Sequence, residues 1–264
     1  MKRVAITTLA GLFFALAAHA DLKTEEIKYH VDGEEFTGYL AYDDAHTEKR
    51  PGILVLHEWW GHDEYARRRA EMLAELGYTA LALDMYGTGK LAEHPEDAKS
   101  FMQAVTGDPQ LVQQRFDAAF KLLTEHASVN ATQTAAIGYC MGGGMALAMA
   151  RQGADLDGVV VFHGGLNAGA PETPSASSAI KGEVLVFQGG DDPFIPAEQI
   201  QAFENEMKTA KVPYTLKVYP DAKHSFTVPN ADRLGKTFDL PLAYDKTADD
   251  DSWQRTKAFL SSIF

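Results

Sequence analysis

The sequence predicts an α/β fold in which a mostly parallel central sheet is covered by helices on both faces. Short apolar segments, of the kind that is buried on both faces of a parallel sheet, alternate along the chain with segments of helical period. Before this alternation begins, residues 25–42 carry Asp32-Gly33 between two segments of alternating polarity, which predicts a β-hairpin. No internal repeat or low-complexity tract interrupts the pattern.

Six apolar runs are the predicted parallel strands, and they lie at 52–58, 79–86, 134–140, 158–164, 183–190 and 214–220. The predicted helices lie between and after them, at 64–76, 94–105, 108–126, 143–152, 196–210 and 252–264. Pro109 behind Asp108 indicates a helix start, since proline is tolerated at the first helical position. Acidic residues 249–251 favour the N-terminus of the last helix, where the helix dipole stabilises negative charge. Strand–helix alternation of this kind requires an open sheet with both faces covered.

Two connections are longer than usual for a compact domain, at 165–181 and 225–250. Both follow predicted strands, so they begin at the carboxyl ends of the strands, where open α/β sheets bind their ligands. We expect these two loops to form the rim of a pocket.

The first twenty residues have the pattern of a secretory signal. Lys2 and Arg3 precede an apolar run that ends in Ala18-His19-Ala20, a small-residue cleavage site. The apolar run is short for a membrane span, so an uncleaved anchor is the weaker alternative. Cleavage after Ala20 leaves residues 21–264 as one domain of ordinary size, in the periplasm or outside the cell.

Charge and cysteine content exclude several classes of protein. The formal charge is −13, and loss of Lys2 and Arg3 with the signal makes it −15, which argues against nucleic acid or an anionic membrane as partner. A single cysteine excludes an intrachain disulfide. Outside residues 1–20 no stretch is apolar for about 18 residues, so we expect a soluble monomer without a membrane span. The run Arg67–Arg69 is interpreted as the solvated face of a helix.

The single cysteine, Cys140, lies between a predicted strand and a predicted helix, in Gly138-Tyr139-Cys140-Met141-Gly142. This is the nucleophile-elbow pattern G-x-S-x-G with cysteine at the central position. The turn strains the central backbone and crowds the residues two before and two after it, so that glycine is needed there. The helix N-terminus favours a thiolate, and the Met141 N–H would be an oxyanion donor. The alternative is a buried core cysteine.

A thiol nucleophile needs a base and a carboxylate that orients the base. Past the last predicted strand lies His224, the candidate base, whose alternative is an ordinary surface histidine. Asp191 and Asp192 follow the strand at 183–190 and compete for the acid position. We favour Asp192, with Asp191 as a turn residue.

The chain resembles the dienelactone hydrolase family of the α/β-hydrolase superfamily over essentially all of residues 21–264. The resemblance rests on GYCMGG, GGDDPFIP, DAKHSF and HEWWG, which begin at residues 138, 189, 221 and 57. It implies an α/β-hydrolase fold and a Cys–His–Asp triad that acts on esters or lactones without a metal or organic cofactor.

Further roles follow from the same resemblance. Glu58 matches the glutamate that contacts the nucleophile and helps deprotonate it, with a solvated loop acid as the alternative, and Trp59 would supply the second oxyanion N–H. Members specific for dienelactone hold the substrate carboxylate with two arginines, whereas the matching positions here are Thr88 and Val228. Lys90 replaces the first arginine only if its loop bends inward. An anion without bidentate arginine contacts loses its most directional partner, so dienelactone is not the expected natural substrate.

Aromatic residues near the motifs are expected to line the mouth of the pocket and to suit an apolar or aromatic acyl group. They are Trp59, Trp60, Tyr86, Tyr139 and Phe226, and core packing is the alternative for each. The polar cluster His57, Glu58, His62 and Asp63 has no recognised metal-ligand spacing, so no metal is expected.

The sequence therefore predicts an exported esterase or lactone hydrolase in which Cys140 forms an acyl-thioester with a small-molecule substrate. Two alternatives remain open. An acyl transferase, thioesterase or peptidase would use the same triad, and a periplasmic thiol sensor or binding protein would use no catalysis. The Asp–His pair argues against a sensor, which needs neither residue.

Overall fold

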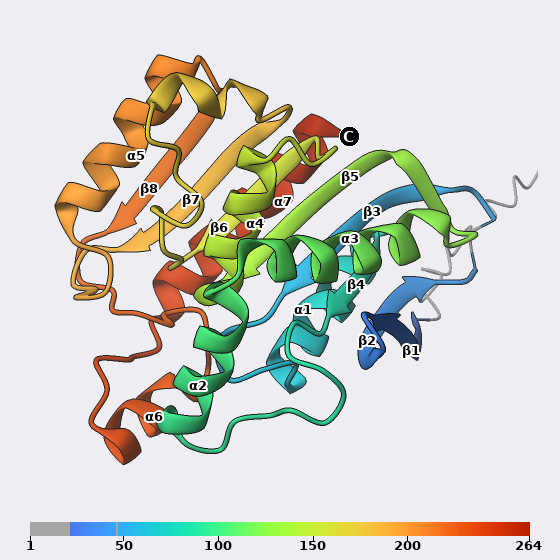
Figure 1. The fold of residues 1–264 in the computed structure, drawn as a ribbon, viewed down its shortest axis with the longest axis horizontal. Coiled ribbons are helices and arrows are strands. Elements are labelled where there is room, and N and C mark those ends of the chain that lie inside the picture. The colour runs from blue at the N-terminus through green and yellow to red at the C-terminus, as the bar shows by residue number, and fades with distance from the viewer. Residues whose placement is uncertain (1–21, 46) are drawn as a thin grey trace, which may run out of the picture.

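The computed structural model describes residues 22–45 and 47–264, so the predicted signal at 1–20 lies outside the described residues. Within them, one sheet has the strand order β1-β2-β4-β3-β5-β6-β7-β8 (Figure 1). Its strands are β1 (Leu22–Val31), β2 (Glu34–Asp43), β3 (Arg50–Leu56), β4 (Thr79–Leu83), β5 (Val129–Tyr139), β6 (Gly158–Phe162), β7 (Glu183–Gly189) and β8 (Tyr214–Tyr219). The strands from β3 to β8 pair in parallel, which confirms the predicted mostly parallel sheet.

The predicted N-terminal hairpin is also confirmed. β1 and β2 pair antiparallel with Val31 opposite Glu34, and β2 pairs antiparallel with β4. Asp32 and Gly33 form the connection with φ values of 49° and 84°. Two consecutive positive φ values are the requirement of a two-residue hairpin turn, which is why Asp-Gly signals it.

The helices differ from the prediction mainly at the C-terminal end. They are α1 (Glu64–Ala74), α2 (Pro95–Thr106), α3 (Pro109–Glu125), α4 (Met141–Arg151), α5 (Ala197–Ala210), α6 (Ala231–Phe238) and α7 (Lys246–Ile263), with a 3₁₀ helix at Pro174–Ala179. The predicted loop 225–250 thus contains α6. α7 begins at Lys246 rather than at 252, because the Asp245 side chain accepts hydrogen bonds from the N–H groups of Thr247 and Ala248 and caps it.

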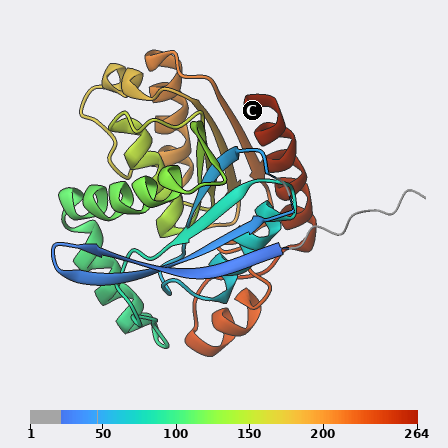
Figure 2. The ribbon, with the colours of Figure 1, turned by 90° about the vertical axis from the view of Figure 1, so that its right-hand side faces the viewer.

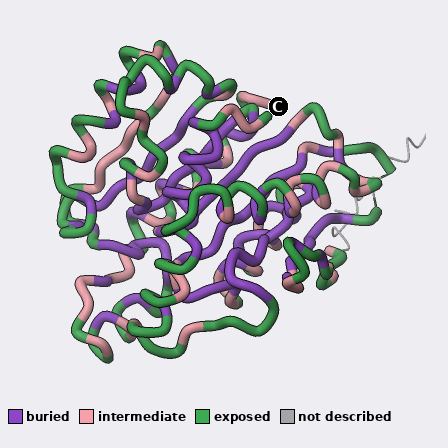
Figure 3. Tube along the Cα trace, viewed as in Figure 1, coloured by how far each residue is buried: buried purple, intermediate pink, exposed green. Residues whose placement is uncertain are grey.

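The sheet is covered on both faces, as Figure 2 shows, with α2 to α5 on one side and α1 and α7 on the other. Alternation along the strands divides the core accordingly: Leu54 and Leu56 of β3 pack in the cluster with α3 and α4, whereas Ile53 and Val55 pack with α1 and α7. The central strands are buried along most of their length (Figure 3). No helix in the described part of the chain is long and apolar enough to cross a membrane.

Arg69 corrects the interpretation of the arginine run as a solvated face. Its side chain is only 4% exposed, because it lies on the face of α1 that packs toward α7. It donates to Asp249 Oδ1 at 2.6 Å and to the Thr227 carbonyl at 3.0 Å. A buried guanidinium needs such partners, and here they tie α1 to α7 and to the segment that follows β8. Arg67 and Arg68 instead form ion pairs with glutamates at the protein surface.

The turn from β5 into α4 places Cys140 in a strained conformation, with φ 52° and ψ −118°. A Cβ at Gly138 would lie 2.1 Å from the Gly142 carbonyl oxygen, and a Cβ at Gly142 would lie 2.4 Å from the Leu56 carbonyl oxygen. Both obstacles are backbone atoms, which cannot move away by a rotamer change. The two glycines therefore allow the elbow to close and allow the segment after β3 to approach it.

We expect Gly138→Ala to lower the free energy of unfolding by about 3 kcal/mol or more, because the added methyl group overlaps backbone atoms of the elbow. Denaturant unfolding followed by circular dichroism measures the change. Gly165→Ala is the matched control: its Cβ would meet only the Asn167 Oδ1 at 3.6 Å, so its effect should stay under about 1 kcal/mol. Equal stability of the two variants would contradict the steric account of the elbow.

Candidate active site

The predicted nucleophile, base and acid come together at the carboxyl ends of β5, β7 and β8. Cys140 and His224 both line a pocket of about 480 Å³. His224 Nδ1 lies 2.7 Å from Asp192 Oδ2. The other nitrogen of the imidazole is thus left for Cys140, whose charge and hydrogen bonding act on His224. The three side chains have the geometric relationship of a nucleophile, a base and an orienting carboxylate.

Asp192 rather than Asp191 is the carboxylate that reaches His224. Asp192 is buried, and its second oxygen accepts a hydrogen bond from the Phe194 N–H at 2.9 Å, which fixes the carboxylate plane. Asp191 is exposed, and its backbone N–H donates to the Ala222 carbonyl at 3.0 Å. Its position on a turn agrees with the structural role expected for it.

The surroundings of His224 favour its protonated form. Burial disfavours the imidazolium, but the charge of Cys140 and hydrogen bonds with Asp192 and Cys140 outweigh it, and the pKa of His224 lies well above its usual range. Protonated His224 is therefore the favoured form beside Cys140.

Glu58 is buried against the loop that carries His224. Its Oε1 accepts a hydrogen bond from Ser225 Oγ at 2.8 Å, and the charge of His224 acts on it. Burial nevertheless raises the pKa of Glu58 to about 7, because removal of water disfavours the carboxylate more than His224 and Ser225 favour it. A carboxyl group with this pKa can both take up and release a proton near neutral pH.

The peptide that joins Glu58 to Trp59 has a fixed orientation. The Met85 N–H donates to His57 Nε2 at 3.1 Å, so the ring proton of neutral His57 is on Nδ1, which lies 2.5 Å from the Glu58 carbonyl oxygen. Burial holds the pKa of His57 below its usual value. Tyr86 Oη donates to the Trp59 carbonyl at 2.9 Å and fixes the next peptide. Because carbonyl and N–H point in opposite directions across a trans peptide, the Trp59 N–H points away from His57.

Met141 occupies the first turn of α4, directly after Cys140 as N-cap. The carbonyl of Cys140 accepts hydrogen bonds from the N–H groups of Gly143 and Gly144 at 3.1 and 3.3 Å. Amides in the first turn have no acceptor within the helix. The Met141 N–H is therefore oriented as an anion-binding group next to the thiol.

The rest of the pocket is almost entirely apolar. Its other lining residues are Trp59, Met102, Thr106, Met141, Gly144, Met145, Gly165, Asn167, Ala168, Phe194, Ile195, Leu240 and Leu242. The loops 165–181 and 225–250 both contribute, as expected of a rim. No lysine or arginine is among the lining residues of the described chain. Lys90 pairs with Glu34, and Thr88 hydrogen bonds to Thr37 Oγ1 at 2.8 Å, so neither faces the thiol.

Of the predicted aromatic lining, only Trp59 faces this pocket. Tyr139 and Phe226 are fully buried in the core on the α1 and α7 face, so the prediction for these two residues is wrong. The side chain of Tyr139 points to the opposite face of the sheet from α4 and stacks on Phe162 at 4.7 Å. Successive side chains of a strand point to opposite faces of the sheet, so Tyr139, which directly precedes Cys140, points away from the pocket.

Trp60 and Tyr86 also lie outside the pocket lining. Trp60 lines a second hollow of about 730 Å³ that Glu58, Val228 and Phe238 share. Tyr86 is buried, and its hydroxyl supports the Trp59 carbonyl rather than facing a ligand. The prediction that these two side chains line the mouth beside Cys140 needs this correction.

Three residues of the site were missing from the sequence prediction. Phe194 is 49% exposed, and its ring lies edge-on to His224 at 5.0 Å. Ser225 has a φ of 57°, which turns its hydroxyl toward Glu58. His163 has a φ of 40° and is completely buried with its ring 5.2 Å from that of His224. The sequence pattern that could have indicated His163 is a histidine at the end of a predicted apolar strand.

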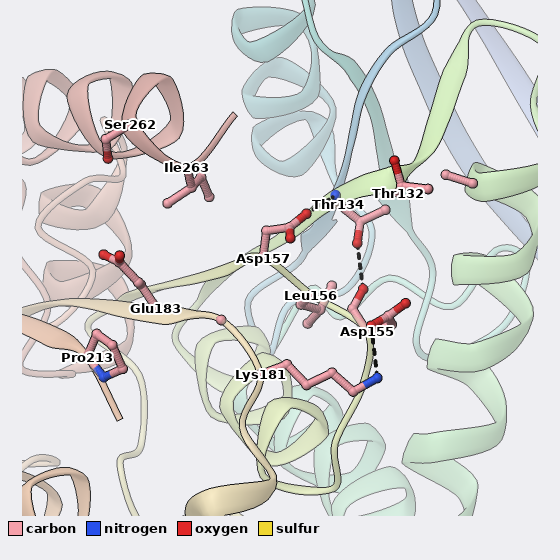
Figure 4. Close-up of a pocket in the computed structure, with 12 residues that line it drawn as sticks. Thr132, Thr134, Asp155, Leu156, Asp157, Lys181, Glu183, Pro213, Ser262 and Ile263 are labelled. Atoms are coloured by element: carbon pink, nitrogen blue, oxygen red, sulfur yellow. Dashed lines mark hydrogen bonds and ion pairs between the residues drawn. The ribbon is translucent and has the colours of Figure 1, made fainter. Parts of the chain in front are cut away.

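A different hollow, of about 380 Å³, lies at the amino ends of β5, β6 and β7, opposite the ends that carry Cys140 and His224 (Figure 4). Thr134 and Lys181 line it, and their hydrogen bonds go to Asp155. Neither Cys140 nor His224 belongs to it. Among the residues that the structure describes, no group of three or more histidine, cysteine or acidic side chains is arranged to hold a metal ion.

Comparison with known proteins identifies the family of the chain. A model of the dienelactone hydrolase family matches residues 36–264. A relative from Saccharolobus solfataricus named as a carboxymethylenebutenolidase is 28% identical over 90% of this chain and 98% of its own. A relative from a Bradyrhizobium species named as a probable 2-oxo-3-(5-oxofuran-2-ylidene)propanoate lactonase is 30% identical over 74% of this chain and 80% of its own.

Solved structures lead to the same family. The crystal structure of a dienelactone hydrolase-like promiscuous phosphotriesterase from metagenomic libraries is 34% identical, with a TM-score of 0.85 over 92% of this chain and 99% of that one. The sheet order, the elbow at Cys140 and these matches together show that the chain has the α/β-hydrolase fold and belongs to the dienelactone hydrolase family of ester and lactone hydrolases.

Proposed function

We propose that the protein hydrolyses uncharged esters or lactones with Cys140 as nucleophile, His224 as acid–base and Asp192 as the residue that orients His224. The observation that carries the proposal is the apolar pocket whose floor holds the thiol and a histidine bonded to a buried carboxylate at 2.7 Å. The fold alone would not carry it, since one fold hosts many activities.

The reaction follows from these positions. The Cys140 thiolate attacks the substrate carbonyl carbon, and the carbonyl oxygen becomes an anion that the N–H groups of Met141 and Trp59 stabilise. The His224 imidazolium donates its proton to the leaving oxygen as the carbon–oxygen bond breaks, which gives an acyl-thioester. Water then attacks the thioester, His224 accepts a proton from it, and the thiolate leaves. Glu58, ionised, acts as a second base that keeps the thiol deprotonated.

The lining of the pocket supports the substrate class. A carboxylate-bearing substrate would leave its charge without a lysine or arginine partner in a mostly apolar cavity, which is unfavourable. The relatives named as carboxymethylenebutenolidase and lactonase favour a lactone or ester bond as the one that breaks. We therefore propose a neutral, apolar acyl group for this chain.

Export is part of the proposal and rests on the sequence of residues 1–20, with its basic start, apolar run and Ala18-His19-Ala20. In the periplasm or outside the cell, a single cysteine has no partner for an intrachain disulfide. Retention of that cysteine at the elbow agrees with a catalytic role.

The nucleophile is tested with p-nitrophenyl butyrate and the chain from residue 21. We expect Cys140→Ala to lower kcat/KM by about 10⁴-fold or more, since removal of one triad member abolishes its shared function. Mass spectrometry of the native enzyme under rapid quench should detect the acyl group on Cys140. Undiminished turnover by Cys140→Ala would overturn the proposed function.

The acid is tested by a neighbouring pair of variants. Asp192→Asn should lower kcat by about 10³- to 10⁴-fold, because the amide favours the wrong tautomer of His224. Asp191→Asn changes an exposed turn residue and should leave kcat within about twofold of the native value. Steady-state kinetics on the same ester compares the two. A larger loss of kcat in Asp191→Asn than in Asp192→Asn would show that Asp191, and not Asp192, orients His224.

The role of Glu58 predicts a pH dependence. Its carboxylate is the active form and the pKa of Glu58 is about 7, so kcat/KM should rise as the pH increases through that value. Glu58→Gln cannot ionise, so this limb should disappear, and the plateau should fall by about 10²-fold. The measurement is a pH–rate profile between pH 5 and about 9. A limb that persists in Glu58→Gln must belong to another group.

A further inference from the structure

His163 is a buried group that the proposed reaction does not use. It follows β6 with no exposed surface, and its ring contacts those of His224, Phe226 and Tyr139. Its Nδ1 has no hydrogen-bond partner in any other described residue and lies 3.8 Å from Glu58 Oε1. A buried ring nitrogen that faces the carboxyl group of the second base requires an explanation.

The other ring nitrogen of His163 ends a chain of buried hydrogen bonds. Nε2 lies 2.9 Å from Thr227 Oγ1, which lies 2.6 Å from Tyr65 Oη. Tyr65 Oη in turn accepts a hydrogen bond from Arg69 Nε at 3.1 Å. The guanidinium is itself held by Asp249. The chain therefore runs from a fixed cation on α1 to the histidine beside Glu58.

Only one arrangement of donors and acceptors in this series of hydrogen bonds lets each hydroxyl group donate its proton to the next group. Arginine only donates, so Tyr65 Oη receives a hydrogen bond at one end of the chain. Burial raises the pKa of Tyr65, so the phenol keeps its own proton, which is directed to Thr227. The threonine hydroxyl then donates to His163 Nε2. An imidazole that accepts at Nε2 carries its proton on Nδ1, the nitrogen that faces Glu58.

We propose that Arg69, Tyr65 and Thr227 fix His163 in the Nδ1–H tautomer, and that His163 in this form is a positioning residue that holds the ionised Glu58 carboxylate toward the active site. This inference rests on the proposed role of Glu58 as second base. His163 touches no substrate in this arrangement and acts only through Glu58. The family motifs in the sequence include neither His163 nor the three residues behind it.

The charges around the pair agree with a neutral donor. Burial, the charge of His224 and the charge of Arg69 hold the pKa of His163 well below its usual range, so it stays neutral. Glu58 faces His224 and Ser225 after β8, Asp63 before α1, and Arg69 on α1. A neutral N–H favours the carboxylate over the carboxylic acid. Its loss should therefore make Glu58 harder to ionise.

Two tyrosines offer a matched test of the chain. The Arg69 guanidinium lies 5.1 Å from the ring centre of Tyr65 and 5.4 Å from that of Tyr139. The hydroxyl of Tyr139, however, has no partner among the described residues. Tyr65→Phe and Tyr139→Phe thus each remove one buried phenolic oxygen, but only Tyr65→Phe breaks the chain.

The tautomer is read directly from ¹⁵N NMR spectra of histidine-labelled protein, with His163 assigned by the signal lost in His163→Asn. We expect the Nδ1–H pattern in the native protein and in Tyr139→Phe, and a mixture of tautomers in Tyr65→Phe. An Nε2–H pattern in the native protein would overturn the proposal, as would identical spectra of Tyr65→Phe and Tyr139→Phe. This readout needs no substrate, so it stands even if the proposed function fails.

The effect on Glu58 is read from the pH dependence of kcat/KM. His163→Leu removes the donor, and the midpoint of the limb near pH 7 should rise by about one pH unit. His163→Asn restores an N–H donor near the position of Nδ1 and should recover most of that shift. A purely structural role of His163 would lower kcat in both variants without moving the midpoint. The positioning role would therefore be overturned if the pH-dependent rise in kcat/KM disappears in Glu58→Gln but its midpoint does not move in the His163 variants. That result would leave the proposed function intact.

Discussion

The close approach of the elbow to the segment after β3 is the constraint on which the rest of the site depends. Gly142 lies so near the carbonyls of Leu56 and His57 that no side chain fits between them. This approach brings the first turn of α4 against the end of β3 and the residue before Glu58. The proposed oxyanion donors and the proposed second base thus lie on the two segments that meet at this contact. The strained φ of Cys140 accompanies that contact.

The segment after β8 has a double role in the structure. The carbonyls of His224 and Phe226 accept hydrogen bonds from the N–H groups of Ala243 and Asp245 at 3.2 and 3.0 Å. The return of the chain after α6 therefore runs beside the histidine loop and fixes it. The same return contributes Leu240 and Leu242 to the pocket wall. A change in this wall is consequently coupled to the position of the base.

The sequence was sufficient for the features that depend on local pattern. The hairpin at Asp32-Gly33, the alternation of strands and helices and the elbow around Cys140 all follow from residue type and spacing. Tyr139 and Phe226 are close to Cys140 and His224 in the chain, but their side chains pack in the core on the α1 and α7 face, which the local sequence does not indicate. Arg69 was missed for a related reason: its partner Asp249 lies 180 positions away, and no local pattern connects the two. The sequence favoured Asp192 over Asp191, and the folded sheet brings Asp192 Oδ2 to 2.7 Å from His224 Nδ1.

The proposed role of Glu58 as second base explains why Arg69 pairs with Asp249 rather than with Glu58. An arginine paired directly with Glu58 would hold it ionised at all relevant pH values, as ion pairs with buried carboxylates do. Such a carboxylate would accept a proton from the thiol poorly. The buried cation Arg69 is instead engaged by Asp249, and its hydrogen bonds lead toward Glu58 through two hydroxyls and a neutral imidazole. This arrangement leaves the pKa of Glu58 at about 7, where a general base is most effective at neutral pH. The engagement of Arg69 by Asp249 is thus consistent with the proposed role of Glu58 as a base.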